Sequence, residues 1–103
     1  MVVEYIRYGV PAERSEAFER AYQEAASALE LDEHCQAYEV SRCAEEPTSY
    51  VVRLEWDSIE GHERGFRGGP HFGRFLQAVR PFIDQIEEMR HYTPTSPGWK
   101  RER

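Results

Sequence analysis

The sequence predicts an α+β fold of the ferredoxin-like type, in which two helices cover one face of a four-stranded antiparallel sheet. Segments with alternating apolar residues and segments with apolar residues at helical spacing follow one another as strand, helix, strand, strand, helix, strand. The chain has 103 residues, the length of one small domain. A charged, Pro-containing stretch follows the last predicted strand. We therefore expect a single domain over residues 1–92 and a C-terminal tail over residues 93–103.

The first part of the chain is predicted as a strand followed by a helix. Residues 2–8 (VVEYIRY) are rich in β-prone side chains and end at Gly9 and Pro11, which are typical of a turn. Between about residues 12 and 30, apolar side chains recur every three or four positions, with charged side chains elsewhere. This pattern predicts an amphipathic helix of about five turns.

A hairpin follows this helix. Residues 34–43 and 49–57 alternate as strands do, and the loop between them contains Pro47. Successive side chains of a strand point to opposite sides of a sheet, so alternate residues of the second strand share one face. The residues on its apolar face are Tyr50, Val52, Leu54 and Trp56. We expect this face to be buried.

The segment between the third and fourth strands is predicted to contain two helical pieces. Asp57 with Glu60 three positions later matches a capping box, which begins a helix. The sequence GGP at residues 68–70 interrupts this helix, and its proline suits the first turn of a second helix over residues 71–79. The last strand is predicted over residues 86–92.

The sheet face that the helices leave open carries apolar or aromatic side chains on the first three strands. Depending on register, these are Val3, Tyr5, Cys35, Ala37 and Val51. An uncovered face of this kind is typical of an association surface. We therefore expect two copies of the chain to pack into a homodimer through the open sheet face.

Composition and charge argue against several kinds of partner. The formal net charge is −6 and the basic residues are scattered among acidic ones, so we expect no nucleic-acid partner. No stretch approaches the roughly 20 apolar residues that span a bilayer, so we expect no membrane association. Cys35 and Cys43 lie on one predicted strand, about 26 Å apart, beyond the reach of a disulfide. We therefore expect a cytoplasmic protein.

Two residues near the end of the third predicted strand are candidates for a functional site. Trp56 ends that strand, and His62 lies on the face of the following helix that meets the sheet. A His and a Trp in a crevice between helix and sheet are typical of a ligand pocket. A His near its reference pKa of about 6.5 accepts a proton at neutral pH. The alternative is a core histidine that bonds to the backbone.

His71 is a second candidate base, because it begins a helical piece where the helix dipole favours the neutral imidazole. The alternative is an exposed residue of the first turn. Aromatic side chains are numerous for so small a core, and most of them must simply pack. Those that line the crevice would indicate a flat aromatic ligand. The candidates for such contacts are Tyr5, Phe66, Phe72 and Phe75.

Four glycines, Gly61, Gly65, Gly68 and Gly69, fall in the same segment. Inside a helix each costs about 1 kcal/mol relative to alanine, and no evident need of the core explains them. They indicate either a close approach of the backbone to a ligand or a segment that opens as a lid. The alternative, for two of them, is a simple junction between two short helices.

Neither a metal site nor a cofactor is predicted from motif spacing. His62, His71 and His91 are not part of a Glu-x-x-His motif or of a paired-cysteine motif. The turn after the first strand carries one glycine, where dinucleotide-binding loops need three.

Three segments resemble the antibiotic biosynthesis monooxygenase family. They are YVVRLEWDSIEGH (50–62), GGPHFGRFLQAVRPF (68–82) and IEEMRHY (86–92). The resemblance extends over nearly all of residues 2–92 and implies a dimeric α+β barrel built from two ferredoxin-like chains.

The resemblance also implies roles for three residues. Trp56 corresponds to the strand-end Trp that contacts substrate, His62 to the helix His that faces the pocket, and His71 to the His of the Pro-His-Phe start. Family members with known activity oxygenate phenols or quinols without metal or flavin. The resemblance therefore implies a cofactor-independent monooxygenase, an oxidoreductase, for an aromatic substrate of the quinol, phenol or anthrone type.

Two departures from the family pattern concern the ligand. Members of the quinol-oxidising branch and of a related haem-degrading branch use an Asn near the ligand, and this chain has no Asn. The haem branch also places its His at the position of Phe75 or Leu76. The alternatives are a non-catalytic dimeric ligand-binding or interaction domain, or a haem-binding protein with His62 or His71 as axial ligand.

Overall fold

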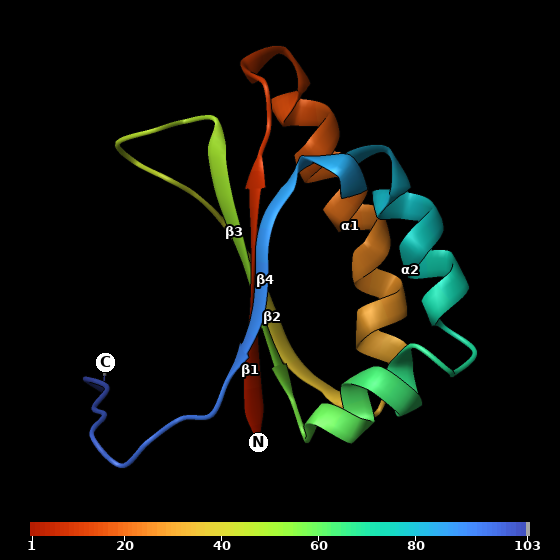
Figure 1. Cartoon of the computed structure of the whole chain (residues 1–103), viewed down its shortest axis with the longest axis vertical. Helices are drawn as coiled ribbons and strands as arrows, with labels where there is room; N and C mark the ends of the chain where they lie inside the picture. The colour runs from red at the N-terminus through yellow and green to blue at the C-terminus, as the bar shows by residue number, and fades with distance from the viewer. Residues whose placement is uncertain (103) are drawn as a thin grey trace.

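The computed structural model describes residues 1–102, and Figure 1 shows a sheet with the helices on one side of it. The strands are β1 (Val2–Gly9), β2 (Cys35–Arg42), β3 (Ser49–Trp56) and β4 (Ile86–Tyr92), in the spatial order β2-β3-β1-β4. All three strand pairs are antiparallel. The two main helices are α1 (Ser15–Leu31) and α2 (Phe72–Val79). The predicted α+β, ferredoxin-like arrangement is confirmed.

Short helical turns connect these elements. They are the 3₁₀ segments η1 (Ala12–Arg14) and η3 (Arg80–Gln85) and the π-helical segment η2 (Gly61–Phe66). The prediction that Asp57 caps the helix after β3 is wrong. The Ser58 hydroxyl accepts the hydrogen bond from the Gly61 backbone N–H at 2.8 Å instead, because the Asp57 carboxylate is bonded to His34.

The core lies between α1, α2 and the inner face of the sheet. On β3, the side chains of Tyr50, Val52, Leu54 and Trp56 are all buried, as the alternation predicts. On α1, the apolar residues at helical spacing contact this face, and the buried Tyr22 hydroxyl forms a 2.6 Å hydrogen bond with the Tyr8 hydroxyl of β1. This hydrogen bond satisfies both hydroxyl groups, which would otherwise be costly to remove from water.

The open face of the sheet differs from the prediction at Cys35. Pairing between β2 and β3 shifts register between Cys35 and Ala37, so one extra residue is inserted into β2. Cys35 therefore turns toward the helices and packs against the core. Tyr5 lies on the open face, beside Tyr92 of β4, with the two ring centroids 5.4 Å apart.

The chain beyond β4 forms no helix or strand within residues 93–102, and residue 103, the end of the predicted tail, lies outside the described range. The division into a domain and a tail stays a prediction. Among the described residues, no helix combines the length and the apolar character needed to cross a lipid bilayer.

Candidate functional site

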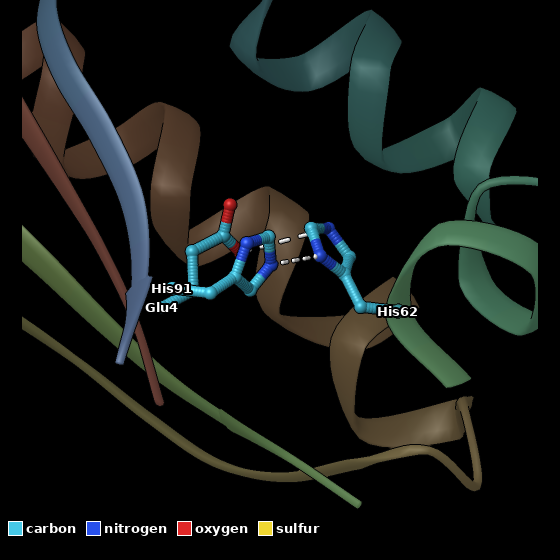
Figure 2. Close-up of side chains that lie close together, drawn as sticks. All are labelled: Glu4, His62 and His91. Atoms are coloured by element: carbon cyan, nitrogen blue, oxygen red, sulfur yellow. Dashed lines mark hydrogen bonds and ion pairs between the residues drawn. The ribbon is translucent and has the colours of Figure 1, made fainter. Parts of the chain in front are cut away.

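Three ionisable side chains meet between the sheet and η2: Glu4, His62 and His91 (Figure 2). The His62 Nδ1 atom lies 2.8 Å from His91 Nε2, and His62 Nε2 lies 3.5 Å from Glu4 Oε1. Glu4 is 2% exposed and His62 is 4% exposed. We call these three residues the Glu-His-His cluster.

Strand register brings Glu4 and His91 together. Glu4 of the central strand β1 is paired directly with His91 of β4. Directly paired residues of antiparallel strands project to the same face, and here this is the face that the helices cover. His62 approaches from the opposite side, on η2, which follows β3 after a short turn. No two members of the cluster are close in sequence.

Trp56, at the end of β3, holds two members of the cluster in place. Its indole Nε1–H donates a 3.0 Å hydrogen bond to Glu4 Oε1. Its ring stacks on the His62 imidazole, with centroids 4.4 Å apart and planes inclined by 16°. The Trp56 side chain is itself 1% exposed, so its position is fixed by packing.

An apolar cavity of about 170 Å³ adjoins this cluster. Its walls come from the inner face of the sheet, η2, α2 and η3. The lining residues that are aromatic or ionisable are Glu4, Trp56, His62, Phe66, Arg67, Phe72 and Phe75. A mostly apolar cavity with a few convergent polar groups is typical of a small-molecule site.

Burial controls the ionisation of the cluster. Burial lowers the pKa of His62 to about 4, and the positive charges of Arg67 and His91 add to this effect. Burial also raises the pKa of Glu4, although the hydrogen bond from Trp56 partly offsets the rise. The expectation that His62 keeps a pKa near 6.5 is therefore wrong. At neutral pH its imidazole is uncharged.

The structure brings five of the predicted site residues to one cavity and leaves two outside it. Trp56, His62, Phe66, Phe72 and Phe75 line the cavity.

Tyr5 does not line this cavity, because it alternates with the inward-facing Glu4 and Ile6 and projects to the open sheet face. His71 immediately precedes α2, and it is not among the described residues that line the cavity.

Three site residues were missed from the sequence: Glu4, Arg67 and His91. One signal for Glu4 was present, since it shares the alternating face of β1 with Val2 and Ile6 and is a charged residue on an otherwise apolar face. Its partner His91 gave no comparable signal, because only the register between β1 and β4 shows which residue it faces.

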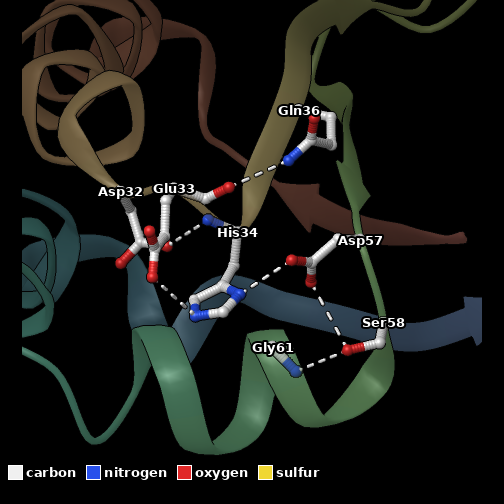
Figure 3. Close-up of polar contacts among 7 residues, drawn as sticks. All are labelled: Asp32, Glu33, His34, Gln36, Asp57, Ser58 and Gly61. Carbon is white, nitrogen blue, oxygen red and sulfur yellow. Dashed lines mark hydrogen bonds and ion pairs between the residues drawn. The ribbon is translucent and has the colours of Figure 1, made fainter.

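Two of the unexplained glycines, Gly61 and Gly65, make room for side chains from outside η2. Figure 3 shows Gly61 near the hydrogen-bonded side chains of His34 and Asp57. A Cβ atom at Gly65 would lie 2.3 Å from His34 Cδ2, and one at Gly61 would clash with the Asp57 carboxylate and lie 2.9 Å from His34 Nδ1. The His34 Nδ1 atom is also 2.8 Å from the Asp57 carboxylate. These two glycines therefore serve the close packing of η2 on the start of β2. This replaces the ligand or lid interpretation for Gly61 and Gly65.

The pair of His34 and Asp57 is expected to make stability depend on pH. Hydrogen bonding to Asp57 raises the pKa of His34, and the same bond lowers the pKa of Asp57. The contribution of His34 to the free energy of unfolding is fully present below the pKa of the unfolded chain, about 6.5. It is lost as the pH rises through the higher pKa of the folded protein. The contribution of Asp57 to the free energy of unfolding is present above about pH 4, the pKa of the unfolded chain. It is lost as the pH falls through the lower pKa of the folded protein.

The stability difference between the wild type and His34→Gln is therefore expected to be larger near pH 5.5 than near pH 8.5. Thermal unfolding of both proteins at the two pH values measures it. Asp57→Asn is the matched variant, because it removes the charge that holds the proton on His34. Equal differences at the two pH values would contradict the assignment.

The fold and the cavity together define the class: a ferredoxin-like α+β protein with an apolar, His- and Trp-containing cavity between its helices and its sheet. The chain belongs to the antibiotic biosynthesis monooxygenase family, whose sequence pattern matches residues 1–78. The predicted family is thereby confirmed.

Known proteins place the chain within this family's fold. An uncharacterised protein, YczJ of Bacillus subtilis (strain 168), is 27% identical over 75 residues, which is 73% of this chain and 79% of YczJ. A Bordetella bronchiseptica protein named for the same family is 19% identical, with a TM-score of 0.76 over 92% of this chain and 97% of its own. A variant of SnoaB, a cofactor-independent oxygenase from Streptomyces nogalater, is 18% identical, with a TM-score of 0.75 over 93% of this chain and 94% of its own.

Proposed function

We propose that the protein is a cofactor-independent monooxygenase that acts on a small aromatic compound of the phenol or quinol type. Membership of the family supports an oxygenase, and the similarity in fold to a cofactor-independent oxygenase is consistent with it. The observation that carries the proposal is the apolar cavity with the buried His62 in its wall. A flat apolar ring fits such a cavity, and its hydroxyl group finds a proton acceptor there.

The size of the cavity favours a single-ring substrate. A dry protein cavity of about 150 Å³ is known to hold benzene, and this one measures about 170 Å³. A three-ring anthrone would need the walls to move apart. The exposed side chains of Ile83 and Met89 contribute to the lining, so one edge of the cavity lies at the protein surface.

The proposed reaction begins when His62 accepts the phenolic proton. The phenolate then gives an electron to oxygen, which the neutral phenol does far less readily. Combination of the two radicals forms a carbon–oxygen bond, and loss of water leaves a quinone. One phenol and one O₂ thus give one quinone and one water, so the substrate supplies all the electrons. Trp56 and Phe66 hold the ring, and the Glu4 carboxylate near His62 stabilises the imidazolium that forms.

Oxygen uptake by the protein in EDTA tests this function, with a panel of substituted phenols, hydroquinones and anthrones. The wild type is expected to consume oxygen above the autoxidation background, and His62→Ala to lose about 10²–10⁴-fold of that rate, the usual contribution of a general base. His71→Ala is the matched control and is expected to keep most of the rate, since His71 does not line the cavity. Uptake that is the same in wild type and His62→Ala would contradict the role of His62.

A non-catalytic ligand-binding domain is the second candidate. Two observations favour it: the chain has no Asn, and a His with a pKa of about 4 is a weak base. Binding of a phenol with no oxygen uptake in the same experiment would support this function over the first. Haem binding has less support, because a cavity of about 170 Å³ is small for a tetrapyrrole.

We also propose that the protein forms a homodimer through the open sheet face. Two aromatic rings, Tyr5 and Tyr92, lie side by side there and are 37% and 48% exposed. Aromatic side chains are enriched where protein surfaces associate. The same face carries the ion pair of Arg53 and Glu55 at 2.6 Å, so a partner would meet a mixed surface.

A further inference from the structure

We propose that Glu4, His62 and His91 form a binding site for one divalent transition-metal ion per chain, with the ligand preference of Zn²⁺ and Fe²⁺. The proposal goes beyond the proposed oxygenase activity, which uses His62 without a metal, and it does not rest on that activity. It rests on the kinds of donor atom in the cluster, their spacing and the residues that support them.

The donor set is one that these ions prefer. Two imidazole nitrogens and one carboxylate oxygen are the protein ligands of many catalytic zinc sites and of non-haem iron sites. One such atom from each of the three residues lies within 4.8 Å of the others. No motif spacing reveals this set, because the three residues come from β1, η2 and β4.

The spacing needs only small shifts to hold an ion. Ligand atoms at 2.0–2.1 Å from a tetrahedral ion lie about 3.3 Å from one another. His62 Nδ1 and His91 Nε2, at 2.8 Å, are closer than this value, and one donor atom from each of the three residues lies within 4.8 Å of the other two. A small separation of the two imidazole rings, with a turn of the His91 side chain, would replace their hydrogen bond with two bonds to the ion.

Trp56 fixes the positions of two of the proposed ligands, as residues next to the ligands do in known metal sites. Its indole N–H donates to Glu4 Oε1, and its ring stacks on His62. Hydrogen bonds of this kind fix the direction of a ligating carboxylate and raise the affinity of a metal site. Because only Oε1 is engaged by Trp56, the other carboxylate oxygen stays available to an ion.

The adjoining cavity leaves room for a further ligand. It begins at Glu4 and His62 and continues between apolar walls, so water or a substrate oxygen can complete the coordination of the ion. Arg67 also lines this cavity, and its positive charge opposes the binding of a cation. Removal of that charge offers a variant that keeps all three ligands.

Titration of the EDTA-treated protein with Co²⁺, in the absence of any substrate, tests the proposal. The wild type is expected to show a visible absorption band of protein-bound Co²⁺ that saturates at one ion per chain, and one equivalent of Zn²⁺ is expected to abolish it. Arg67→Gln is expected to bind at least as tightly as the wild type. His34→Ala and His71→Ala, which remove histidines outside the cluster, are expected to keep the band.

His91→Ala and His62→Ala are expected to lose more affinity than the roughly 10–100-fold that follows loss of an outer-shell partner. Because His91 is less buried than His62, His91→Ala is the variant expected to keep the fold, and far-ultraviolet circular dichroism checks this. Zn²⁺ is expected to raise the unfolding temperature of the wild type but not that of His91→Ala.

A wild type without the Co²⁺ band, or a band that persists in His91→Ala, would overturn the metal site. Oxygen uptake is measured in EDTA and Co²⁺ binding without substrate, so failure of one leaves the other standing.

Discussion

Replacement of Phe18 by alanine is expected to lower the free energy of unfolding by about 3–5 kcal/mol. Phe18 on α1 is 0% exposed, and its ring lies between helix and sheet. Four other rings surround it with centroid distances of 4.7–5.3 Å; they belong to Tyr8, Tyr22, Tyr50 and Phe82. Alanine would leave a cavity among these rings, which the rigid sheet cannot close. Because small domains have only about 5–15 kcal/mol of stability, much of this variant is expected to be unfolded on mild heating.

Equilibrium unfolding in urea measures this loss. Leu31→Ala is the matched control on the same helix, since Leu31 is 62% exposed and its truncation is expected to change stability by no more than about 0.5 kcal/mol. Equal losses in the two variants would show that the aromatic cluster around Phe18 is not the centre of the core.

Replacement of Gly65 by alanine is expected to destabilise the protein by about 1–3 kcal/mol, the usual cost of overpacking. The new Cβ atom would lie 2.3 Å from the His34 ring, which its hydrogen bond to Asp57 holds in place. Either the ring moves and that hydrogen bond breaks, or η2 shifts away from β2. Urea unfolding of Gly65→Ala measures the cost.

Two further variants separate this clash from a general effect of alanine. Gly73→Ala on α2 adds a Cβ atom that meets nothing within 4 Å, so it is expected to stabilise the helix by up to about 1 kcal/mol. In a His34→Ala background the ring is absent, and Gly65→Ala is expected to cost little. A cost that is unchanged in that background would rule out His34 as the reason for the glycine.

Most of the fold could be predicted from the sequence because local patterns and tertiary packing agree. The alternation of Tyr50, Val52, Leu54 and Trp56 identifies the buried face of β3, and these residues are buried as expected. On α1 the helical spacing of apolar residues identifies the side that contacts the sheet. In both elements the period of the sequence is the period of the structure.

The errors arise where a distant residue decides a local structure. Asp57 fits the pattern of a helix cap, but its carboxylate is hydrogen-bonded to His34, which lies in the turn before β2. Cys35 fits the open face, but its pairing with Trp56 of β3 turns it inward. Gly65 looks unfavourable in a helix until the His34 ring is placed against it. None of these partners is near in sequence.

The same limit applies to the site. Trp56, His62 and the three phenylalanines could be assigned to a crevice from helical and strand periods alone. Glu4 and His91 could not, because their meeting depends on the pairing of the first and last strands. The low pKa of His62 also depends on how deeply the surrounding chain buries it. Periodicity predicts which side of an element is buried, but not which residues meet there.

Pairing of β1 with β4 also determines when the site can exist. Glu4 and His91 are 87 positions apart, the difference between their residue numbers, so their contact closes almost the whole chain into a loop. Contacts between such distant parts of a chain are among those that slow folding. A growing polypeptide on the ribosome therefore has no complete Glu-His-His cluster until its last strand has emerged and paired. The proposed metal site is therefore complete only after β4 has paired with β1.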